Sequence, residues 1–234
     1  MPVSYSQNLA KLEKDIGHPF KNSALLVEAL THRSYHHENP DRSSSYNERL
    51  EFIGDAVLAL VIVESLFRDP RGFSESEMSE IKSHLVKGSV LSEIAAGITL
   101  GAYLRLGRGE AETGGRTKKS LLADAMEAVM GAVYLDGGYE AARNVILNLF
   151  GEKIATAISS GQYHSYKTEL QEESQLRLGV LPEYRVVSQQ GEEHRKTFTV
   201  DVYIAGQRYG RGSGRNKKEA QTAAAKEALE RLRV

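Results

Sequence analysis

The sequence has 234 residues, 41% of them hydrophobic, and a formal net charge of -1, which suits one large or two modest globular domains. It has no cysteine, which excludes disulfides and thiolate metal sites and is typical of a reducing compartment. The longest apolar run, 56–63, is too short to span a bilayer. The first eight residues lack the pattern of a signal peptide, so we expect a cytoplasmic protein that does not enter a membrane.

The charge is unevenly distributed. Residues 166–234 contain 13 Lys and Arg against 10 Asp and Glu, whereas the first 165 contain 17 against 21, giving +3 and -4. An acidic part followed by a basic one suggests metal chemistry in the first and contact with a polyanion in the second. The totals alone establish neither.

Helices dominate the predicted beginning of the chain. Leu9, Leu12 and Ile16 have helical spacing, and a cap at Asn22 or Ser23 predicts a second helix. The histidines of 31–38 could suggest a metal site, but no His or carboxylate has the spacing that would complete a zinc site, so a structural role is favoured. A turn-rich loop, 39–45, then leads to the next helix.

An acidic face distinguishes the helix that the pattern predicts from residue 47 to about residue 63. At about 100° per residue, Glu48, Glu51 and Asp55 fall within roughly 60° of one another. The apolar residues Leu50, Ile53, Val57 and Val61 cluster on the other side. A solvated surface is the usual explanation of such a face, but no basic residue follows any of the three acids at i+4. A divalent metal is the alternative counter-charge.

A capping box at Ser74 and Glu77 predicts the start of another helix. Glu75, between them, either favours the helix dipole or serves a site. The glycine-rich segment 107–119 is predicted to be a loop. Its basic residues either meet the phosphates of a long substrate or are simply solvated; they are Arg108, Arg116, Lys118 and Lys119.

A second acidic pair, Asp124 and Glu127, has i, i+3 spacing on a predicted helix. Ala128 and Gly131 share its face and leave room for something to approach, while larger apolar residues cover the other side. If this helix packs against the first acidic helix, four or five carboxylates converge. A final helix at about 139–158 should end this domain, residues 1–158, and a polar linker, 159–164, should follow.

The second domain, 165–234, is predicted to contain a helix, three strands at 184–187, 197–204 and 207–213, and a last helix capped by Asn216. Leu170 and Leu176 should anchor the first helix. Its other face carries Thr168, Gln171, Glu172 and Gln175.

Lys217 and Lys218 begin the last helix, where cations oppose the helix dipole, so a phosphate site is indicated. With Gln171 and Glu172 able to meet 2′-hydroxyls, and His194 in the loop between the first two strands, this surface suits the shape of A-form RNA. A mixed charged surface without a ligand is the alternative.

The residues of 47–55, Asn-Glu-Arg-Leu-Glu-Phe-Ile-Gly-Asp, resemble the signature of the ribonuclease III family. Residues 121–128 resemble that family's second acidic motif, and the C-terminal third resembles its double-stranded RNA-binding domain. The resemblance implies an all-α endonuclease domain followed by a small α+β domain of order α-β-β-β-α.

The resemblance also implies an activity, the Mg2+-dependent hydrolysis of double-stranded RNA to 5′-phosphate and 3′-hydroxyl ends, in the processing of ribosomal RNA precursors and other structured RNAs. By this resemblance Glu51, Asp124 and Glu127 bind Mg2+, for which Mn2+ can substitute. Glu127 and Asp55 are then the most critical acids, and Glu48 and Glu75 support them.

Phe52 lies at about 40° from Glu48, on the acidic face. Leaving it in water forfeits roughly 1.5 to 3 kcal/mol of burial, so either a loop or a second chain should cover it. The resemblance implies a contact within a homodimer.

Two other classes of protein are possible from the sequence. A catalytically silent RNA-binding or ribosome-assembly protein could share this fold, but it has no reason to keep a mutually repelling acidic cluster. A helical scaffold protein does not explain the basic last helix.

Overall fold

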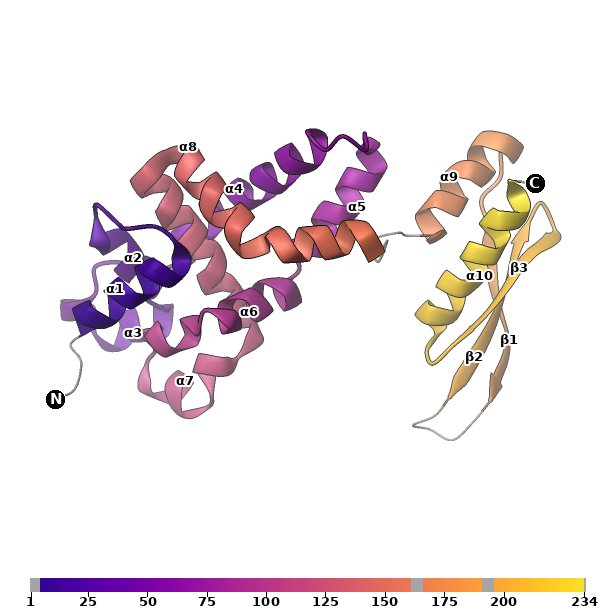
Figure 1. Ribbon diagram of the computed structural model, residues 1–234. Coiled ribbons are helices and arrows are strands. Elements are labelled where there is room, and N and C mark those ends of the chain that lie inside the picture. The colour runs from indigo at the N-terminus through magenta and orange to yellow at the C-terminus, as the bar shows by residue number, and fades with distance from the viewer. Residues whose placement is uncertain (1–4, 161–165, 191–195, 234) are drawn as a thin grey trace. The chain divides into compact units, whose positions relative to one another are not determined.

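The computed structural model describes residues 5–160, 166–190 and 196–233 (Figure 1). The chain divides into two compact units, Met1–Tyr163 and His164–Val234. The segment expected as a linker, 159–164, begins inside a helix that extends to Ser160, and residues 161–165 lie outside the described ranges. No helix within these ranges is long and apolar enough to cross a membrane.

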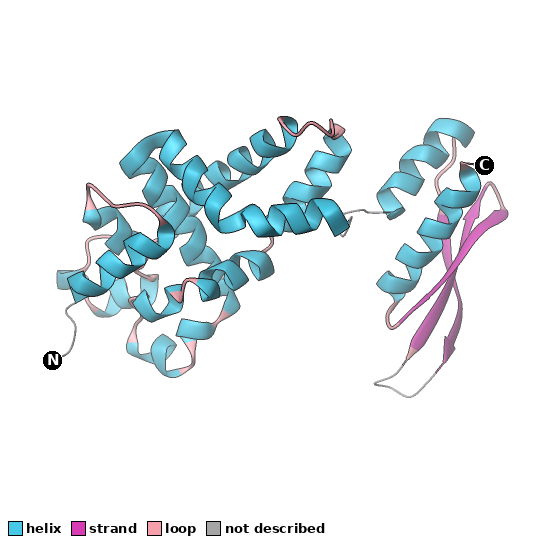
Figure 2. Cartoon of the chain, in the orientation of Figure 1, coloured by secondary structure: helices cyan, strands magenta, loops and turns pink. Residues whose placement is uncertain are grey.

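Unit 1 is helical (Figure 2). Its longer helices are α1 (Tyr5–Ile16), α4 (Glu48–Phe67), α5 (Glu75–Leu85), α6 (Gly88–Gly97) and α8 (Lys119–Ser160). Shorter helices connect them: α2 (Ser23–Ala29), α3 (Arg33–Glu38), η1 (Pro40–Arg42), η2 (Leu100–Tyr103), α7 (Arg108–Glu112) and η3 (Gly115–Thr117). Two predicted caps are present. The Asn22 side chain accepts a hydrogen bond from the backbone of Ala24, and Ser74 and Glu77 form the capping box.

The core of unit 1 lies around α8, which packs against α2, α4, α5 and α6. The apolar side of α4 is buried as predicted, with Leu50, Val57 and Val61 at most 6% exposed. Met126 and Val129 of α8 are fully buried. Both acidic helices therefore turn their apolar sides into one core, which leaves their carboxylates near its edge.

Helix α8 changes direction at Gly138, whose φ of 77° is outside the helical range. Asp136, just before this kink, accepts hydrogen bonds from the backbone of Lys21 and Asn22, and its carboxylate lies 2.9 Å from His18. The kink is therefore tied to the connection between α1 and α2, and the second half of α8 corresponds to the predicted final helix.

Unit 2 has the order α9 (Tyr166–Leu178), β1 (Glu183–Gln190), β2 (Thr197–Ile204), β3 (Gln207–Gly214) and α10 (Lys217–Leu232). The strands form an antiparallel sheet in the order β1-β2-β3, and helix α10 packs against β2, β3 and α9. Leu170 of α9 is fully buried in this core, as predicted. The prediction for Leu176 is wrong: its side chain is 84% exposed, because it lies outside the stripe of α9 that contains Leu170 and Ser174.

Glycines on β3 allow α10 to approach very closely. A Cβ atom on Gly210 or Gly212 would lie 2.3 or 2.1 Å from backbone atoms of Ala224, and one on Gly214 would lie 2.6 Å from the backbone nitrogen of Ala220. Real Cβ atoms do not come so near to other atoms, so only glycine fits here. These contacts set the height of α10 above the strands.

Candidate functional site

Helices α4 and α8 cross at two glycines. A Cβ atom on Gly54 would lie 1.8 Å from the carbonyl oxygen of Glu127, and one on Gly131 would lie 2.2 Å from the carbonyl oxygen of Leu50. The sequence suggested that Gly131 leaves room for an approaching group, and that group is α4 itself. The role of Gly54 was missed, although a glycine inside a helix costs about 1 kcal/mol and so marks a close approach.

This crossing brings the two predicted acidic clusters together. Burial raises the pKa of Glu127 to about 7, with further contributions from the charges of Asp55, Glu51 and Asp124. Burial also raises the pKa of Glu51, and Asp124, Glu48 and Asp55 add to the effect. Negative charges from both α4 and α8 therefore contribute to the raised pKa values of Glu51 and Glu127.

An open pocket lies beside this cluster. Its lining comes from α3, from the start of α4, from the α7 region and from the start of α8: His32, Arg33, Ser34, His37, Asn47, Glu48, Glu51, Glu110, Lys118, Ser120, Leu121 and Asp124. Glu48 does not stand unpaired there, because Arg33 lies 3.6 Å from its carboxylate. Arg33 belongs to the segment 31–38, for which the sequence favoured a structural role, and its side chain nevertheless lines the pocket.

The chemistry of the donors suits a hard divalent cation such as Mg2+, since every acidic group here offers carboxylate oxygens. Burial is the main cause of the raised pKa of Glu127, and the neighbouring negative charges that add to it are what a bound cation would offset. Within the described ranges, however, no three His, Cys, Asp or Glu side chains are arranged so that they could hold a metal ion as they stand. Binding would therefore require the carboxylates to turn toward a common point.

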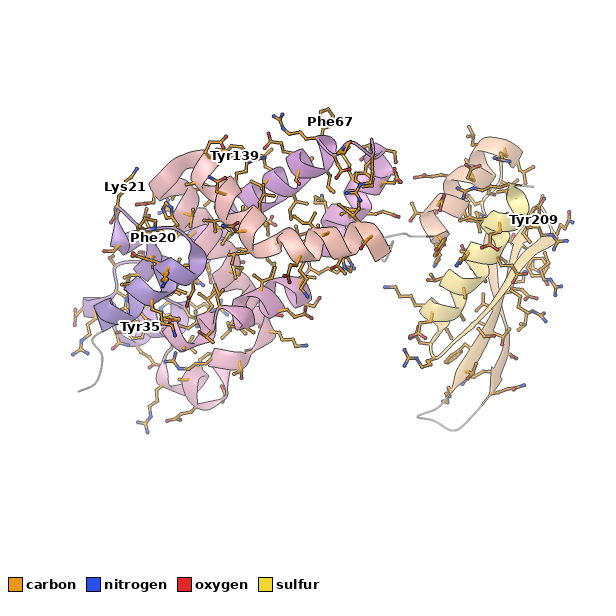
Figure 3. All side chains as sticks on the ribbon, in the orientation of Figure 1. Phe20, Lys21, Tyr35, Phe67, Tyr139 and Tyr209 are labelled. Carbon is orange, nitrogen blue, oxygen red and sulfur yellow. The ribbon has the colours of Figure 1, made fainter. Side chains whose placement is uncertain are left out.

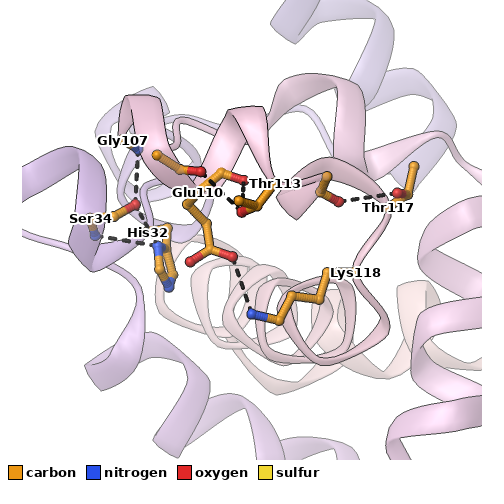
Figure 4. A network of polar contacts seen from close by, with 9 residues as sticks. His32, Ser34, Gly107, Glu110, Thr113, Thr117 and Lys118 are labelled. Carbon is orange, nitrogen blue, oxygen red and sulfur yellow. Dashed lines mark hydrogen bonds and ion pairs between the residues drawn. The ribbon is translucent and has the colours of Figure 1, made fainter.

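His32 joins α3 to the α7 region through a short network (Figure 4). Its Nδ1 lies 2.8 Å from the hydroxyl of Ser34, which accepts a hydrogen bond from the backbone of Gly107. Burial lowers the pKa of His32, against the opposing charge of Glu110. The neutral ring accepts a bond at Nδ1 from the backbone of Ser34, so its proton belongs on Nε2. The structural role predicted for this segment fits that network, although His32 also lines the pocket.

The basic segment 107–119, predicted to be a loop, contains the short helices α7 and η3, and its basic side chains have different partners. The Nη1 group of Arg116 donates to the backbone carbonyl oxygens of Gly101, Ala102 and Leu104, which ties this exposed side chain to the region of η2. Its contact with a phosphate stays a prediction. Arg108 pairs with Glu112 along the short helix α7. Lys118 pairs with Glu110 at 3.2 Å, and both residues line the pocket.

The predicted RNA-binding residues of unit 2 lie on two helices. Thr168 and Gln171 of α9 line a small pocket together with Lys167, Leu181, Pro182 and Tyr184, and Glu172 is exposed on the same helix. Lys217 and Lys218 are exposed in the first turn of α10, which Asn216 caps by accepting from the backbone of Glu219. His194 lies outside the described residues.

Both units match known families. Residues 22–154 match the family model described as ribonuclease-III-like, and residues 166–232 match the double-stranded RNA binding motif. The chain belongs to the ribonuclease III family. Among curated relatives, Ribonuclease 3 of Syntrophotalea carbinolica is 45% identical over 227 residues, covering 97% of this chain and 98% of the relative. That of Caldanaerobacter subterraneus is 46% identical, with coverages of 97% and 99%. A ribonuclease III with this domain pair is an endoribonuclease of double-stranded RNA.

A solved structure supports the assignment of unit 1. The nuclease domain of ribonuclease III from Campylobacter jejuni superposes with a TM-score of 0.57 and 39% identity, covering 62% of this chain and 97% of that one. That structure is described as flexible in a region involved in dimer formation of its nuclease domain. A second structure of that domain gives the same TM-score at 38% identity.

Two further site residues predicted for this ribonuclease III, Glu75 and Phe52, have exposed side chains. Glu75 is exposed in the first turn of α5 and is not among the described residues that line the pocket. Phe52 is 84% exposed on α4, and Phe67, labelled in Figure 3, is 76% exposed at the end of the same helix. Within the described part of unit 1, no loop covers Phe52, so burial under a local loop does not explain its position there.

Proposed function

We propose that this ribonuclease III hydrolyses phosphodiesters of double-stranded RNA with Mg2+, leaving 5′-phosphate and 3′-hydroxyl ends. Its substrates would be ribosomal RNA precursors and other structured RNAs. The observation that carries the proposal is the convergence of Glu51, Asp55, Asp124 and Glu127 at the α4–α8 crossing, beside an open pocket.

In this proposal Glu51, Asp124 and Glu127 bind the ion, and Mn2+ can substitute because it also accepts oxygen ligands. When bound, the ion would supply a hydroxide nucleophile and stabilise charge on the scissile phosphate. Glu127, with its pKa near 7 in the metal-free chain, must release its proton before it can act as a ligand. Asp55, whose charge contributes to the raised pKa of Glu127, is proposed to be, with Glu127, the acid most critical for the chemistry.

The remaining acids have supporting roles. Glu48 holds the guanidinium of Arg33 at the pocket, 3.6 Å away, and so keeps a cation where a phosphate would enter. For Glu75, support comes from the family resemblance alone.

RNA recognition is proposed for unit 2. The exposed side chains of Thr168, Gln171 and Glu172 would meet 2′-hydroxyls in a minor groove, while Lys217 and Lys218 would bind phosphate at the start of α10. His194 is proposed as a further contact with the RNA. This division gives unit 2 most of the affinity and unit 1 the chemistry.

A homodimer is proposed through Phe52. Cutting both strands of a duplex requires two sites related by a two-fold axis, and a C2 dimer supplies them with one self-complementary interface. Phe52 is on the same helix as Glu51 and Asp55, so a contact at this side chain would fix the distance between the two acidic clusters. The exposed apolar ring supports this arrangement.

The decisive test separates cutting from binding. Glu127→Gln keeps the size of the side chain but removes a metal-binding charge, so it should abolish Mg2+-dependent cleavage of duplex RNA and leave retention in a gel shift intact. Glu152→Gln, at an exposed acid of the same helix, is the control. Comparable cleavage by the Glu127 variant would refute the site, and a wild-type chain that binds duplex without cutting it would favour a silent RNA-binding protein.

A further inference from the structure

We propose that Lys118, held by Glu110, is a substrate-positioning residue that grips an RNA phosphate beside the carboxylate cluster. The inference rests on the proposed function, because it concerns how the same site admits RNA. Figure 4 shows the pair, in which the lysine side chain reaches across to the glutamate. The ammonium nitrogen lies 3.2 Å from the Glu110 carboxylate, and both side chains line the pocket that contains Asp124.

The pocket lining carries more negative than positive charge, so RNA can enter only if a cation meets its phosphates. Among the described residues that line it, four are acids and only two carry a permanent positive charge; these are Glu48, Glu51, Glu110 and Asp124 against Arg33 and Lys118. A polyanion entering this field is repelled unless cations meet its phosphates. Glu48 pairs with Arg33, and Glu110 pairs with Lys118. The other two acids belong to the carboxylate cluster. Glu48 and Glu110 therefore each hold a cation at the pocket.

The ion pair leaves Lys118 able to bind. A lysine ammonium has three donors, and Glu110 occupies one of them in the contact described. The lysine side chain is 54% exposed, whereas that of Glu110 is 23% exposed, so the acid is the anchored partner. Phosphate can therefore be bound without breaking the pair.

The backbone around both residues is closely fixed. A Cβ atom on Gly115 would lie 2.6 Å from the carbonyl oxygen of Glu110, and Gly107 donates to Ser34 on α3. The carbonyl of Lys118 accepts the first backbone bond of α8, from Leu122. Lys118 is thus attached to the same helix that carries Asp124 and Glu127, which fixes a bound phosphate relative to the reacting one.

The experiment compares full-length variants on a duplex RNA that contains one cleavage site. We expect Lys118→Gln to reduce kcat/KM about tenfold and to lower by about one the slope of log Kd against log salt, measured without metal. Lys118→Arg should restore most of both. Glu110→Gln should slow cleavage but leave the salt slope unchanged, because the lysine charge remains.

Lys153→Gln is the matched control, since Lys153 forms an ion pair with Glu93 and does not line the pocket. It should behave as wild type. A Lys118→Gln chain with wild-type rate and slope would overturn the proposal, and a wild-type rate in Glu110→Gln would overturn the positioning role of Glu110. If the wild type itself failed to cleave, the proposed function would fall, and the salt slope would still decide whether Lys118 meets phosphate.

Discussion

Substituting Gly54 by alanine should separate the two acidic helices. The new Cβ atom would lie 1.8 Å from the carbonyl oxygen of Glu127 and 3.0 Å from the backbone nitrogen of Gly131. Reaching an ordinary contact of about 3.4 Å requires a shift of roughly 1.5 Å, and no rotamer change relieves it because the obstructing atoms are backbone. Overpacking of this kind costs about 1 to 3 kcal/mol or more, and the better helix propensity of alanine returns about 1 kcal/mol at most. Because the clash is with backbone atoms, the cost should lie at the upper end of this range, and we expect a net loss of about 2 kcal/mol.

The same shift would displace Glu127 from Glu51 and Asp55, and a misplacement of about 1 Å can cost on the order of 100-fold in rate. Urea unfolding followed by circular dichroism would measure the stability, and single-turnover cleavage would measure the rate. Gly151→Ala is the control, because Gly151 is helical in α8 and its Cβ would meet nothing within 4 Å. It should be neutral or slightly stabilising. A Gly54→Ala chain as stable and as active as Gly151→Ala would refute this account of the crossing.

The remaining predictions concern charge, assembly and RNA affinity. The folded chain raises the pKa of Glu127 from 4.5 to about 7, so without metal its contribution to stability is fully present below pH 4.5 and is lost as the pH rises through 7. The upper limit is roughly 3 kcal/mol, which solvent screening at a half-exposed carboxyl reduces to about 1 kcal/mol. Urea titrations at several pH values should show this decline in wild type and not in Glu127→Gln. Phe52→Asp should give folded chains that sediment as monomers and cleave little double-stranded RNA. Leu176→Asp, at an equally exposed leucine of unit 2, should not change the oligomeric state. A Phe52→Asp chain that remained a tight dimer would exclude the contact. Lys217→Ala combined with Lys218→Ala should weaken duplex binding and lower its salt slope by up to about two, while Lys11→Ala with Lys14→Ala, at exposed lysines of α1, should leave both unchanged.

The periodicity and capping patterns of the sequence predicted features that depend on a single helix. The apolar side of α4, the capping box at Ser74 and the cap at Asn216 are local patterns, and the structure confirms them. Contacts between distant segments were not predictable from spacing. Nothing in the sequence near Arg116 shows that its guanidinium meets carbonyls of η2, and nothing near Arg33 shows that it pairs with Glu48.

Leu176 illustrates a second limit of sequence patterns. Two leucines six residues apart do not lie on one side of a helix, since six residues turn about 600°, or 240° beyond a full turn. Burial of Leu170 therefore gave no reason to expect burial of Leu176. The packing of α4 against α8 was raised from the sequence only as a condition, and the role of Gly54 in it was not recognised.

The three glycines of β3 hold α10 close to the sheet, and the RNA contacts proposed for the first turn of α10 depend on that short distance. Because α10 lies directly on the strand, each added methyl group would raise the helix, and with it the lysines of its first turn, relative to the sheet. An A-form duplex presents its grooves at fixed intervals, so the protein must match that spacing with rigid parts. Alanine at Gly214, beside the lysines, should alter the fit to RNA most directly, and alanine at Gly210 should tilt the far end of the helix. Substitutions buried in the interior of unit 2 could thus retune its selectivity among duplex geometries without changing any residue that touches RNA.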